Sequence, residues 1–418
     1  MEETHVVTCF LRNRGEVLLF RRSDEVGSYS GQWGAVAGHA EGDPDRAARE
    51  EIREESGLGG AVSLVRQGEP FAVEDGDTRW TVHPYLFDCE SREVETNCET
   101  TEFEWVSPTE IRRRETVPDL WKSYERVAST VETVKADTDH GSAWLSVRAL
   151  SVLRDRAGVL ATTDEDGWND LAALATDLRA ARPSMTVIEN RINRTMAEAN
   201  DDRTPEAVES AARVGIERAL DADTEAAYEA ADLLGETVLT LSRSGTVLDA
   251  LRQADIEEIV IAESRPAREG VGVAEELAAE RNVTLAVDAA VSHLLTERPI
   301  ETVLVGADTV LPNGSVLNKV GTRGTAIAAS YEGIPTYAVA ASDKISIDAE
   351  AAFEDGSREA VYDGESAIEV ANPTFDLTPP AFVTVVTEDG RLDSTAIADR
   401  ADELRALASW SNEPRSDS

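Results

Sequence analysis

The sequence predicts an α/β protein with three parts in succession: a domain of strands and one helix at residues 1–135, a helical subdomain at 141–232, and a doubly wound parallel sheet at 233–412. Three observations support this prediction. A chain of 418 residues is expected to form more than one domain, because a single hydrophobic core stops growing at about 250–300 residues. Apolar runs around a glycine turn open the chain. Later in the chain, short apolar runs alternate with helical patterns, as in a parallel sheet covered by helices.

The charge of the chain indicates its environment. The sequence has 81 acidic and 40 basic residues, a net charge of -41, and a pI near 4.4. The acids are spread along the whole length and lysine is rare. In molar salt the Debye length falls to about 3 Å, so such self-repulsion is screened. We therefore expect the cytoplasm of an extreme halophile. The alternative, an acidic tail that binds basic proteins, would require the acids to gather in one segment.

Targeting signals and basic patches are missing from the sequence. No run of 18 apolar residues occurs, and the opening MEETHVVTCF lacks a basic region followed by an apolar one. We therefore expect a soluble, cytoplasmic protein with no membrane association. Aromatic residues make up only 5% of the chain and no basic stripe is present, which argues against direct nucleic-acid binding. The three cysteines have no metal-ligand spacing.

The first domain opens with a predicted hairpin at residues 5–22. The apolar stretches HVVTCFL and EVLLFRR flank an Asn-Arg-Gly turn, whose Gly15 favours a tight reversal. Residues 43–58 have the pattern of one short helix: Asp43 suits the N-cap, Pro44 the first helical position and Gly57 the end. Apolar stretches predict three further strands, near 61–74, 79–88 and 102–106.

Three carboxylates lie on one face of that helix, because Glu51, Glu54 and Glu55 are spaced at i, i+3 and i+4. Their mutual repulsion is costly without a cation. Hard divalent ions take carboxylate oxygens and keep coordination positions for substrate phosphates, so the pattern suits metal-assisted attack on a pyrophosphate. On the carboxylates alone, a solvated acidic face is an equally good interpretation.

The order of hairpin, the loop GSYSGQWGAVAGHAEGD and the helix AAREEIREESGL resembles the Nudix hydrolase family. The resemblance implies an α/β/α sandwich with Glu51, Glu54 and Glu55 as catalytic ligands of Mg²⁺ (or Mn²⁺). The implied reaction is hydrolysis of a nucleoside diphosphate linked to another group. The chain departs from the family pattern at Glu50, where the family usually has Arg, and in a slightly shorter loop before the helix.

The rest of the chain contains two kinds of pattern, separated from the first domain by a polar stretch near residue 138. Apolar residues at three- and four-residue spacing first predict helices at 143–158, 170–183 and 205–220. Six apolar runs then alternate with helical stretches, which predicts an open parallel sheet with helices on both faces. The expected strands are at 236–242, 256–264, 283–287, 301–307, 334–341 and 381–387.

Polar residues follow the strands of this expected sheet. Ser242, Arg265, Asp308 and Lys344 each stand just after an apolar run. Ligands bind beyond the carboxyl ends of strands in open α/β sheets. One such residue could be a loop residue or a helix cap, but their repetition favours a binding site.

The segment VLVGADTVLPNGSVLNKVGTR at 303–323 is the most informative part of this half. Only four lysines occur in the chain, and one of them, Lys319, follows Asn318 and precedes a Gly-Thr turn. A chain that otherwise uses Arg for positive charge is expected to need a compact ammonium group there, such as one that meets a phosphate.

The second half resembles the family of translation initiation factor 2B alpha, beta and delta subunits, which includes methylthioribose-1-phosphate and ribose-1,5-bisphosphate isomerases. The matching segments are ARPSMTVIENRI, ESRPAREG, VDAAV and GADTVLPNGSVLNKVGT. The resemblance implies a Rossmann-like domain in which Arg182, Arg265, Asn318 and Lys319 contact a sugar phosphate. It also implies that Asp308 acts as an acid or base.

Ser242, Glu269 and Lys344 complete the expected substrate-binding set. The isomerases of this family pair their Asp with a Cys after the first strand of the sheet, whereas here Ser242 holds that place and no cysteine follows Cys98. A thiol titrates near about 8.5 and can exchange protons at neutral pH, while a hydroxyl needs a separate base. A noncatalytic domain that senses a nucleotide or sugar phosphate is therefore a competing hypothesis.

Three functional hypotheses stay open on the sequence. The first is a Mg²⁺-dependent hydrolase of nucleoside diphosphate derivatives, fused to a domain that binds a related sugar phosphate or nucleotide. The second is a regulatory protein with a Nudix-like sensor and translation initiation factor 2 as its partner. The third is an active ribose-1,5-bisphosphate isomerase-like enzyme with Asp308 as its acid–base group. The family resemblance also implies a homo-oligomer formed through residues 233–412.

Overall fold

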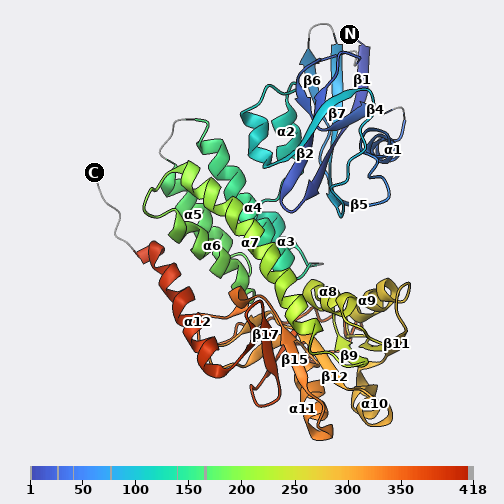
Figure 1. Ribbon diagram of the computed structural model, residues 1–418, viewed down its shortest axis with the longest axis vertical. Coiled ribbons are helices and arrows are strands. Elements are labelled where there is room, and N and C mark those ends of the chain that lie inside the picture. The colour runs from blue at the N-terminus through green and yellow to red at the C-terminus, as the bar shows by residue number, and fades with distance from the viewer. Residues whose placement is uncertain are drawn as a thin grey trace. The chain divides into compact units, whose positions relative to one another are not determined.

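The structure is a computed structural model that describes residues 2–25, 28–40, 42–75, 78–138, 140–163 and 167–412. The chain divides into two units (Figure 1). The first comprises Met1–Thr130, Leu150–Leu171 and Asp202–Glu217, and the second comprises Val131–Ala149, Ala172–Asp201 and Arg218–Ser418. Each unit has its own sheet and is described by itself.

The first unit is organised around a mixed sheet of eight strands in the order β3-β2-β1-β7-β5, with β4 on β1, β6 on β7 and β8 on β2. The long strands β1 and β7 pair in parallel at the centre of this sheet. The strands are β1 (Glu2–Asn13), β2 (Glu16–Arg22), β3 (Trp33–Gly34), β4 (Val36–His39), β5 (Val62–Gln67), β6 (Phe71–Asp75), β7 (Thr78–Cys89) and β8 (Thr100–Val106).

The stretch that the sequence predicts as one strand at 61–74 forms two strands. β5 and β6 both pair antiparallel with β7, but at opposite ends of it. The break falls at Gly68 and Pro70; proline cannot donate to a ladder, and glycine weakens a strand interior. The Gly68 N–H instead donates to the Pro84 carbonyl at 2.9 Å.

Helices cover both faces of this sheet, as the predicted α/β/α sandwich requires. On one face α1 (Pro44–Ser56) packs Ala48 and Ile52 against strand residues that include Val7 and Phe87. On the other face lie η1 (Pro108–Arg112) and α2 (Leu120–Glu125). Alternate strand residues supply the two cores because successive side chains point to opposite faces.

The ends of α1 confirm the helix expected at 43–58. The Asp43 carboxylate accepts hydrogen bonds from the N–H groups of Asp45 and Arg46, and Pro44 holds the first helical position. Gly57 ends the helix with φ 73°, a left-handed conformation that favours glycine. These local signals place the carboxylates of the helix opposite β4.

The helical part of the chain contributes to both units. Its helices are α3 (Val131–Ala136), α4 (Ser142–Leu160), α5 (Trp168–Arg179), α6 (Thr186–Glu198) and α7 (Pro205–Ala231). Within the first unit, the buried Arg154 donates to the Gly15 carbonyl at 2.6 Å, and Arg113 forms an ion pair with Glu209 at 2.5 Å. Helix α6 was not expected from the apolar spacing, and α7 extends beyond the predicted residue 220.

The second unit contains the predicted parallel sheet, in the order β11-β10-β9-β12-β15-β17-β18. Only β18 runs antiparallel to its neighbour. The strands are β9 (Thr237–Leu241), β10 (Glu258–Ala262), β11 (Val283–Ala286), β12 (Thr302–Gly306), β15 (Thr336–Val339), β17 (Thr384–Thr387) and β18 (Gly390–Leu392). The chain adds β10 and β11 on one side of β9 and β12 on its other side. The strand order therefore reverses between β9 and β12, where a ligand crevice is expected.

Helices cover both faces of the parallel sheet. One face packs against α10 (Val291–Glu297), α11 (Thr322–Glu332) and α12 (Ser394–Leu407). The other face packs against the end of α7, α8 (Gly245–Gln253) and α9 (Glu269–Leu277). Figure 1 shows α8 and α9 beside β9 and β11, and α11 near β12. The doubly wound arrangement predicted from the alternating pattern is confirmed.

A small antiparallel sheet that the sequence did not indicate follows β12. It contains β13 (Thr309–Val310), β14 (Val316–Lys319) and β16 (Phe375–Thr378) in the order β13-β14-β16. Three short 3-10 helices complete the unit, namely η2 (Asp288–Ala290), η3 (Ser342–Lys344) and η4 (Ala408–Asn412). Because β13 and β14 form a hairpin, Asp308 and Asn318 are brought to the same end of it.

Replacing Gly270 by Ala is expected to destabilise the second unit by about 1–3 kcal/mol. A Cβ at Gly270 would lie 1.9 Å from the Ala262 carbonyl oxygen, a backbone atom at the end of β10 that cannot rotate away. Chemical unfolding in molar KCl measures the loss. Gly272 is the matched control in the same helix, because a Cβ there meets no atom within 4 Å. A G272A variant as unstable as G270A would contradict this account.

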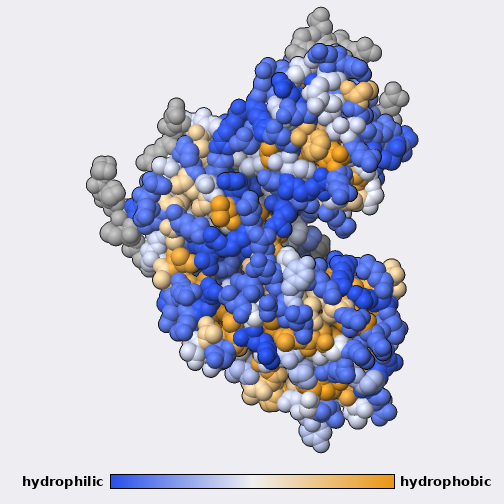
Figure 2. Space-filling model, in the orientation of Figure 1, coloured by the Kyte–Doolittle hydropathy of each residue, from blue (hydrophilic) through white to orange (hydrophobic). Residues whose placement is uncertain are grey.

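The surface reflects the composition. Figure 2 shows a viewed face dominated by hydrophilic residues, with apolar residues in scattered patches. Among the described residues no helix combines the length and apolar character needed to cross a membrane.

Candidate functional site

The carboxylates of α1 gather at β4 in the first unit. The side chain of Glu51 lies against Gly38, so closely that a Cβ at Gly38 would fall 1.8 Å from its Oε1 atom. The Glu55 carboxylate, only 7% exposed, accepts a hydrogen bond from the Ala37 N–H at 3.3 Å. One turn of helix separates the two residues, and the absent side chain of Gly38 makes room for the first of them.

The pKa values of both carboxyl groups are raised. Burial, followed by the charge of Glu51, raises the pKa of Glu55 to about 8. Burial raises the pKa of Glu51 as well, followed by the charges of Glu54 and Glu99. Glu99 lies between β7 and β8, where its carbonyl accepts from the Ser23 N–H at 2.8 Å. Arg22 opposes the shift at Glu55 and His39 opposes the shift at Glu51, but burial and the neighbouring carboxylates outweigh them.

Glu54 faces a different environment. Its carboxylate forms an exposed ion pair with Arg53 at 2.7 Å, and Glu50 pairs with Arg46 at 3.2 Å. Within the described part of the chain, no three His, Cys, Asp or Glu side chains converge closely enough to hold a metal ion. The residues fit a hard cation in part: Glu51 and Glu55 offer oxygen donors whose repulsion a cation would relieve, and Glu54 would have to leave Arg53 to join them.

The metal-free protein is expected to lose stability as the pH rises from about 4.5 to about 8. The folded state keeps the Glu55 proton longer than the unfolded state, because the pKa of Glu55 is raised to about 8 from the ordinary 4.5. Ionisation therefore disfavours the fold, by at most about 5 kcal/mol above pH 8. Unfolding curves in molar KCl with EDTA at pH 5 and pH 8.5 measure this slope.

A Glu55→Gln variant should flatten this pH dependence, and Mg²⁺ should stabilise the wild type more at pH 8.5 than at pH 5. Glu50→Gln is the control, since Glu50 is exposed and paired on the same helix. An unchanged slope in Glu55→Gln would show that another group is responsible.

In the second unit, Asp308 follows β12 and interacts with two polar groups, the Ser142 hydroxyl and the Lys344 ammonium. The Ser142 hydroxyl at the start of α4 donates to Asp308 Oδ1 at 3.2 Å. The Lys344 ammonium is buried and donates to the carbonyl of Ala307 at 2.6 Å. Burial raises the pKa of Asp308, against the opposing effects of Lys344 and Ser142. Burial also lowers the pKa of Lys344, against the charge of Asp308.

Lys319 is held by a carboxylate. Its Nζ lies 2.5 Å from Glu269 Oε1 at the start of α9, and both side chains are mostly buried. Asn318 is buried and donates to the Thr322 hydroxyl at 2.9 Å, at the first turn of α11. The two neighbours thus fix the junction of β14 and α11.

Arg182 contacts Asp137 and Glu354. Its guanidinium donates to the Asp137 carbonyl and is 3.9 Å from Glu354. The charge of Glu354 contributes to the raised pKa of Asp308. Glu354 thus links Arg182 to the surroundings of Asp308, and the phosphate contact expected of Arg182 stays a prediction.

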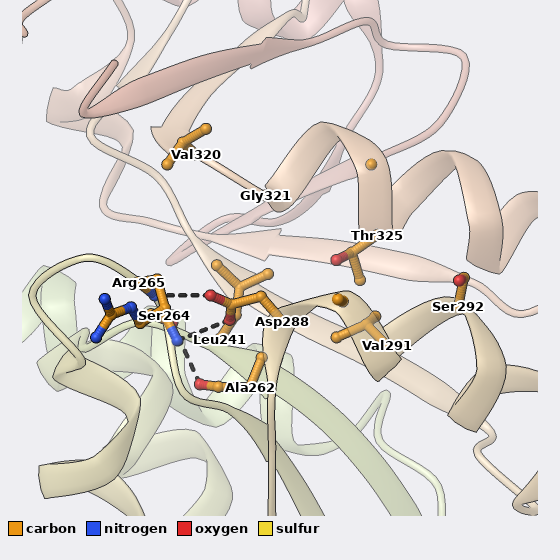
Figure 3. Close-up of a pocket in the computed structure, with 12 residues that line it drawn as sticks. Leu241, Ala262, Ser264, Arg265, Asp288, Val291, Ser292, Val320, Gly321 and Thr325 are labelled. Carbon is orange, nitrogen blue, oxygen red and sulfur yellow. Dashed lines mark hydrogen bonds between the residues drawn. The ribbon is translucent and has the colours of Figure 1, made fainter. Parts of the chain in front are cut away.

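A cavity of about 450 Å³ opens at the carboxyl ends of β9, β10 and β11 (Figure 3). Asp288 holds its wall together, because its two carboxylate oxygens accept the N–H groups of Ser264 and Arg265, each at 2.7 Å. The Ser264 hydroxyl in turn accepts from the Ser242 N–H at 2.6 Å. Leu241, Val291, Val320, Gly321 and Thr325 also line the cavity. Ser242 follows Leu241 in the sequence and Lys319 precedes Val320, so both predicted residues are adjacent in sequence to residues that line the cavity.

Comparison with known families identifies both halves of the chain. Residues 138–394 match the Initiation factor 2 subunit family, and residues 2–127 match the NUDIX domain. The chain belongs to the Initiation factor 2 subunit family. It carries an N-terminal Nudix domain fused to the family domain.

Several relatives resemble the initiation factor domain. The chain is 33% identical over 192 residues to methylthioribose-1-phosphate isomerase 2 of Trypanosoma cruzi, which covers 41% of this chain and 52% of that protein. It thus spans about half the length of that relative. It is 29% identical over 297 residues to ribose 1,5-bisphosphate isomerase of Haloferax volcanii, covering 65% of this chain and 89% of that protein.

A solved structure shows the same fold. The structure of translation initiation factor eIF-2B from Pyrococcus horikoshii OT3 matches with a TM-score of 0.54 and 25% identity, covering 63% of this chain and 94% of that one. The predicted combination of a Nudix sandwich, helices and a doubly wound sheet is therefore confirmed.

Three contributors to the two sites were missed in the sequence. Ser142 of the initiation factor domain lies in HGSAWL and is the first residue of α4, and nothing in its sequence neighbourhood indicates that its hydroxyl reaches Asp308. Glu354 and, in the Nudix domain, Glu99 lie outside any motif. Only the folded chain brings them to the carboxylates that they influence.

Proposed function

We propose that the Nudix domain hydrolyses a nucleoside diphosphate derivative with a divalent cation. The observation that carries this proposal is the convergence of Glu51 and Glu55 at β4, where their pKa values are raised. Glu51, Glu55 and, after leaving Arg53, Glu54 would hold the ion. A bound Mg²⁺ or Mn²⁺ would supply positive charge to the pyrophosphate oxygens and lower the pKa of an attacking water.

The initiation factor domain, in the same proposal, binds a sugar phosphate or nucleotide at the crevice between β9 and β12. Lys319 and Arg182 would hold the phosphate as charge-assisted donors. Since Lys319 already pairs with Glu269 at 2.5 Å, a phosphate would have to share or replace that carboxylate. Fusion of the two domains suggests a shared metabolite that the first produces and the second receives.

Phosphorus NMR of the full chain in molar KCl tests both parts. The protein is offered ADP-ribose, other nucleoside diphosphate compounds and ribose 1,5-bisphosphate, each with Mg²⁺ and with EDTA. Cleavage that requires Mg²⁺ supports the hydrolase and identifies its substrate. If every diphosphate stays intact, the hydrolase proposal fails and the Nudix fold serves as a sensor.

A second candidate, sugar-phosphate isomerisation by the initiation factor domain, is favoured by the surroundings of Asp308. Aldose-to-ketose conversion needs a group that moves a proton between adjacent carbons. The pKa of Asp308 is raised and that of the neighbouring Lys344 is lowered, which brings the two groups closer in proton affinity. Conversion of ribose 1,5-bisphosphate in the same NMR experiment would establish it.

We further propose a cytoplasmic homo-oligomer that assembles through residues 233–412. The composition and the family membership support this part of the proposal. Light scattering in molar KCl tests it, and a monomer at micromolar concentration would refute it.

A further inference from the structure

One amide group of helix α6 holds the backbone of the turn that carries Lys344. Asn190, only 1% exposed, uses its Nδ2 atom to donate two hydrogen bonds. One goes to the Asp343 carbonyl at 2.8 Å and the other to the Ile345 carbonyl at 2.7 Å. These two carbonyls flank Lys344, so a single side chain fixes the backbone on both sides of it.

Charged groups secure the rest of the turn. The Asp343 carboxylate accepts from Arg194 at 2.9 Å and lies 3.3 Å from Arg191, both on α6. On the opposite side, the Glu388 carboxylate after β17 accepts the N–H and hydroxyl of Ser342. The side chains of Asp343 and Ser342 therefore stabilise the turn. The Lys344 side chain instead extends from the turn toward β12.

Lys344 reaches the residue that precedes Asp308. Its Nζ donates to the Ala307 carbonyl at 2.6 Å. Three charged groups influence the ammonium, from different elements: Asp308 after β12, Asp223 on α7 and Arg191 on α6. A small movement of the turn would change the balance among these charges, since buried charges interact strongly at short range.

We propose that Asn190 is a positioning residue that sets the location of the Lys344 ammonium beside Asp308, and that it thereby controls the acid–base pair of the sugar-phosphate site. This inference rests on the proposed function of that site. Asn190 acts through the backbone of residues 343–345, because its two hydrogen bonds go to the carbonyls of Asp343 and Ile345.

The hydrogen-bonding capacity of an amide explains why asparagine suits this position. Two buried carbonyls lie within reach of one nitrogen, and an amide NH₂ supplies two donors at one atom. A leucine at this position has nearly the same size but no donor, so it would leave both carbonyls without their partner. The turn would then relax, and the Lys344 ammonium would gain access to water.

Lysine NMR of the full chain tests the proposal directly. The chain has only four lysines, so labelling lysine with ¹³C at Cε gives four signals, and a Lys344→Met variant assigns one of them. In Asn190→Leu we expect the Lys344 signal to titrate at higher pH, by about one unit, because exposure removes the burial that lowers its pKa. The signals of Lys122, Lys135 and Lys319 should keep their positions.

Asn193→Leu is the matched control. Asn193 is also fully buried on α6, but its Oδ1 accepts from the Trp410 indole at 3.0 Å rather than supporting the Lys344 turn. Both variants should lose stability, and only Asn190→Leu should move the Lys344 signal. If Asn190→Leu does not fold, Asn190→Ser, which keeps one donor, should give a smaller shift in the same direction.

The outcomes separate this inference from the proposed function. An unchanged Lys344 signal in Asn190→Leu, or an equal shift in Asn193→Leu, overturns the positioning role. A specific shift in a protein that neither binds nor converts ribose 1,5-bisphosphate supports the positioning role and excludes that compound as the ligand of the proposed site. If the wild type does convert that substrate, Asn190→Leu should lower kcat about tenfold with little change in KM, since it disturbs the acid–base pair rather than the phosphate contacts.

Discussion

Replacing Glu55 by Gln is expected to lower the rate of pyrophosphate hydrolysis by about 10²- to 10³-fold, because the reaction loses one of two converging carboxylates that would hold the cation. Glu55 is buried, and its carboxylate accepts a hydrogen bond from the Ala37 N–H. A neutral amide of the same shape keeps the packing. The fold should therefore survive, and the variant should be more stable than the wild type at pH 8.5 without metal.

The measurement is the initial rate of phosphorus NMR signal change for the diphosphate that the wild type cleaves. Glu51→Gln should cause a loss of similar size. Glu50→Gln, in the same helix but paired with Arg46 on the surface, should retain wild-type activity. Equal losses in Glu50→Gln and Glu55→Gln would show that general acidity of the helix, rather than a metal site, matters.

Glu54→Gln distinguishes two forms of the site. In the structure Glu54 is exposed and pairs with Arg53 at 2.7 Å. If Glu54 joins the cation when it binds, its removal should weaken the apparent affinity for Mg²⁺. If the variant keeps the Mg²⁺ dependence of the wild type, Glu54 is not a ligand, and only Glu51 and Glu55 of the three predicted carboxylates would bind the cation.

Asp308→Asn is expected to abolish isomerisation of a sugar phosphate, with a loss of at least about 10²-fold in kcat, because the amide cannot accept and return a proton. Asparagine preserves the shape of Asp308 and can still contact the Ser142 hydroxyl. Binding of the ligand should therefore persist. Turnover by coupled assay and binding by calorimetry, both in molar KCl, measure the two effects separately.

Ser242→Ala is the control for this prediction. The family resemblance implies that Ser242 takes the place of a cysteine, and in the structure its backbone N–H donates to the Ser264 hydroxyl. If Asp308 and Lys344 suffice, Ser242→Ala should change turnover little. A loss as large as that of Asp308→Asn would mean that the hydroxyl takes part in proton transfer.

Much of the fold could be predicted because its signals are local. Helix α1 begins and ends where Asp43, Pro44 and Gly57 indicate, and all six predicted strands of the parallel sheet are present. Capping groups and glycine conformations act within one turn of chain, so they can be read from neighbouring residues. Periodicity gave no such signal for α6, whose buried residues include the polar Asn190, Arg191 and Asn193.

The chemistry of the two sites was predictable only in outline. Glu51, Glu55, Asp308 and Lys344 were predicted as site residues because carboxylates at helical spacing and polar residues after strands can be recognised in the sequence. The residues with which these side chains pair could not be predicted from the sequence. That Glu54 pairs with Arg53, or Lys319 with Glu269, depends on which of several nearby charges a side chain meets.

The sequence by itself determined the nature of the parts: a Nudix-type helix with three carboxylates, a doubly wound sheet with polar strand ends, and a strongly negative net charge. Periodicity, capping and composition are properties of neighbouring residues, so they need no tertiary information. Only the tertiary structure decided which carboxylates converge, how Ser142 reaches Asp308 across 166 residues, and that Asn190 holds the turn of Lys344. Burial and charge at a site are sums over residues distant in the chain, and these sums exist only once the chain has folded.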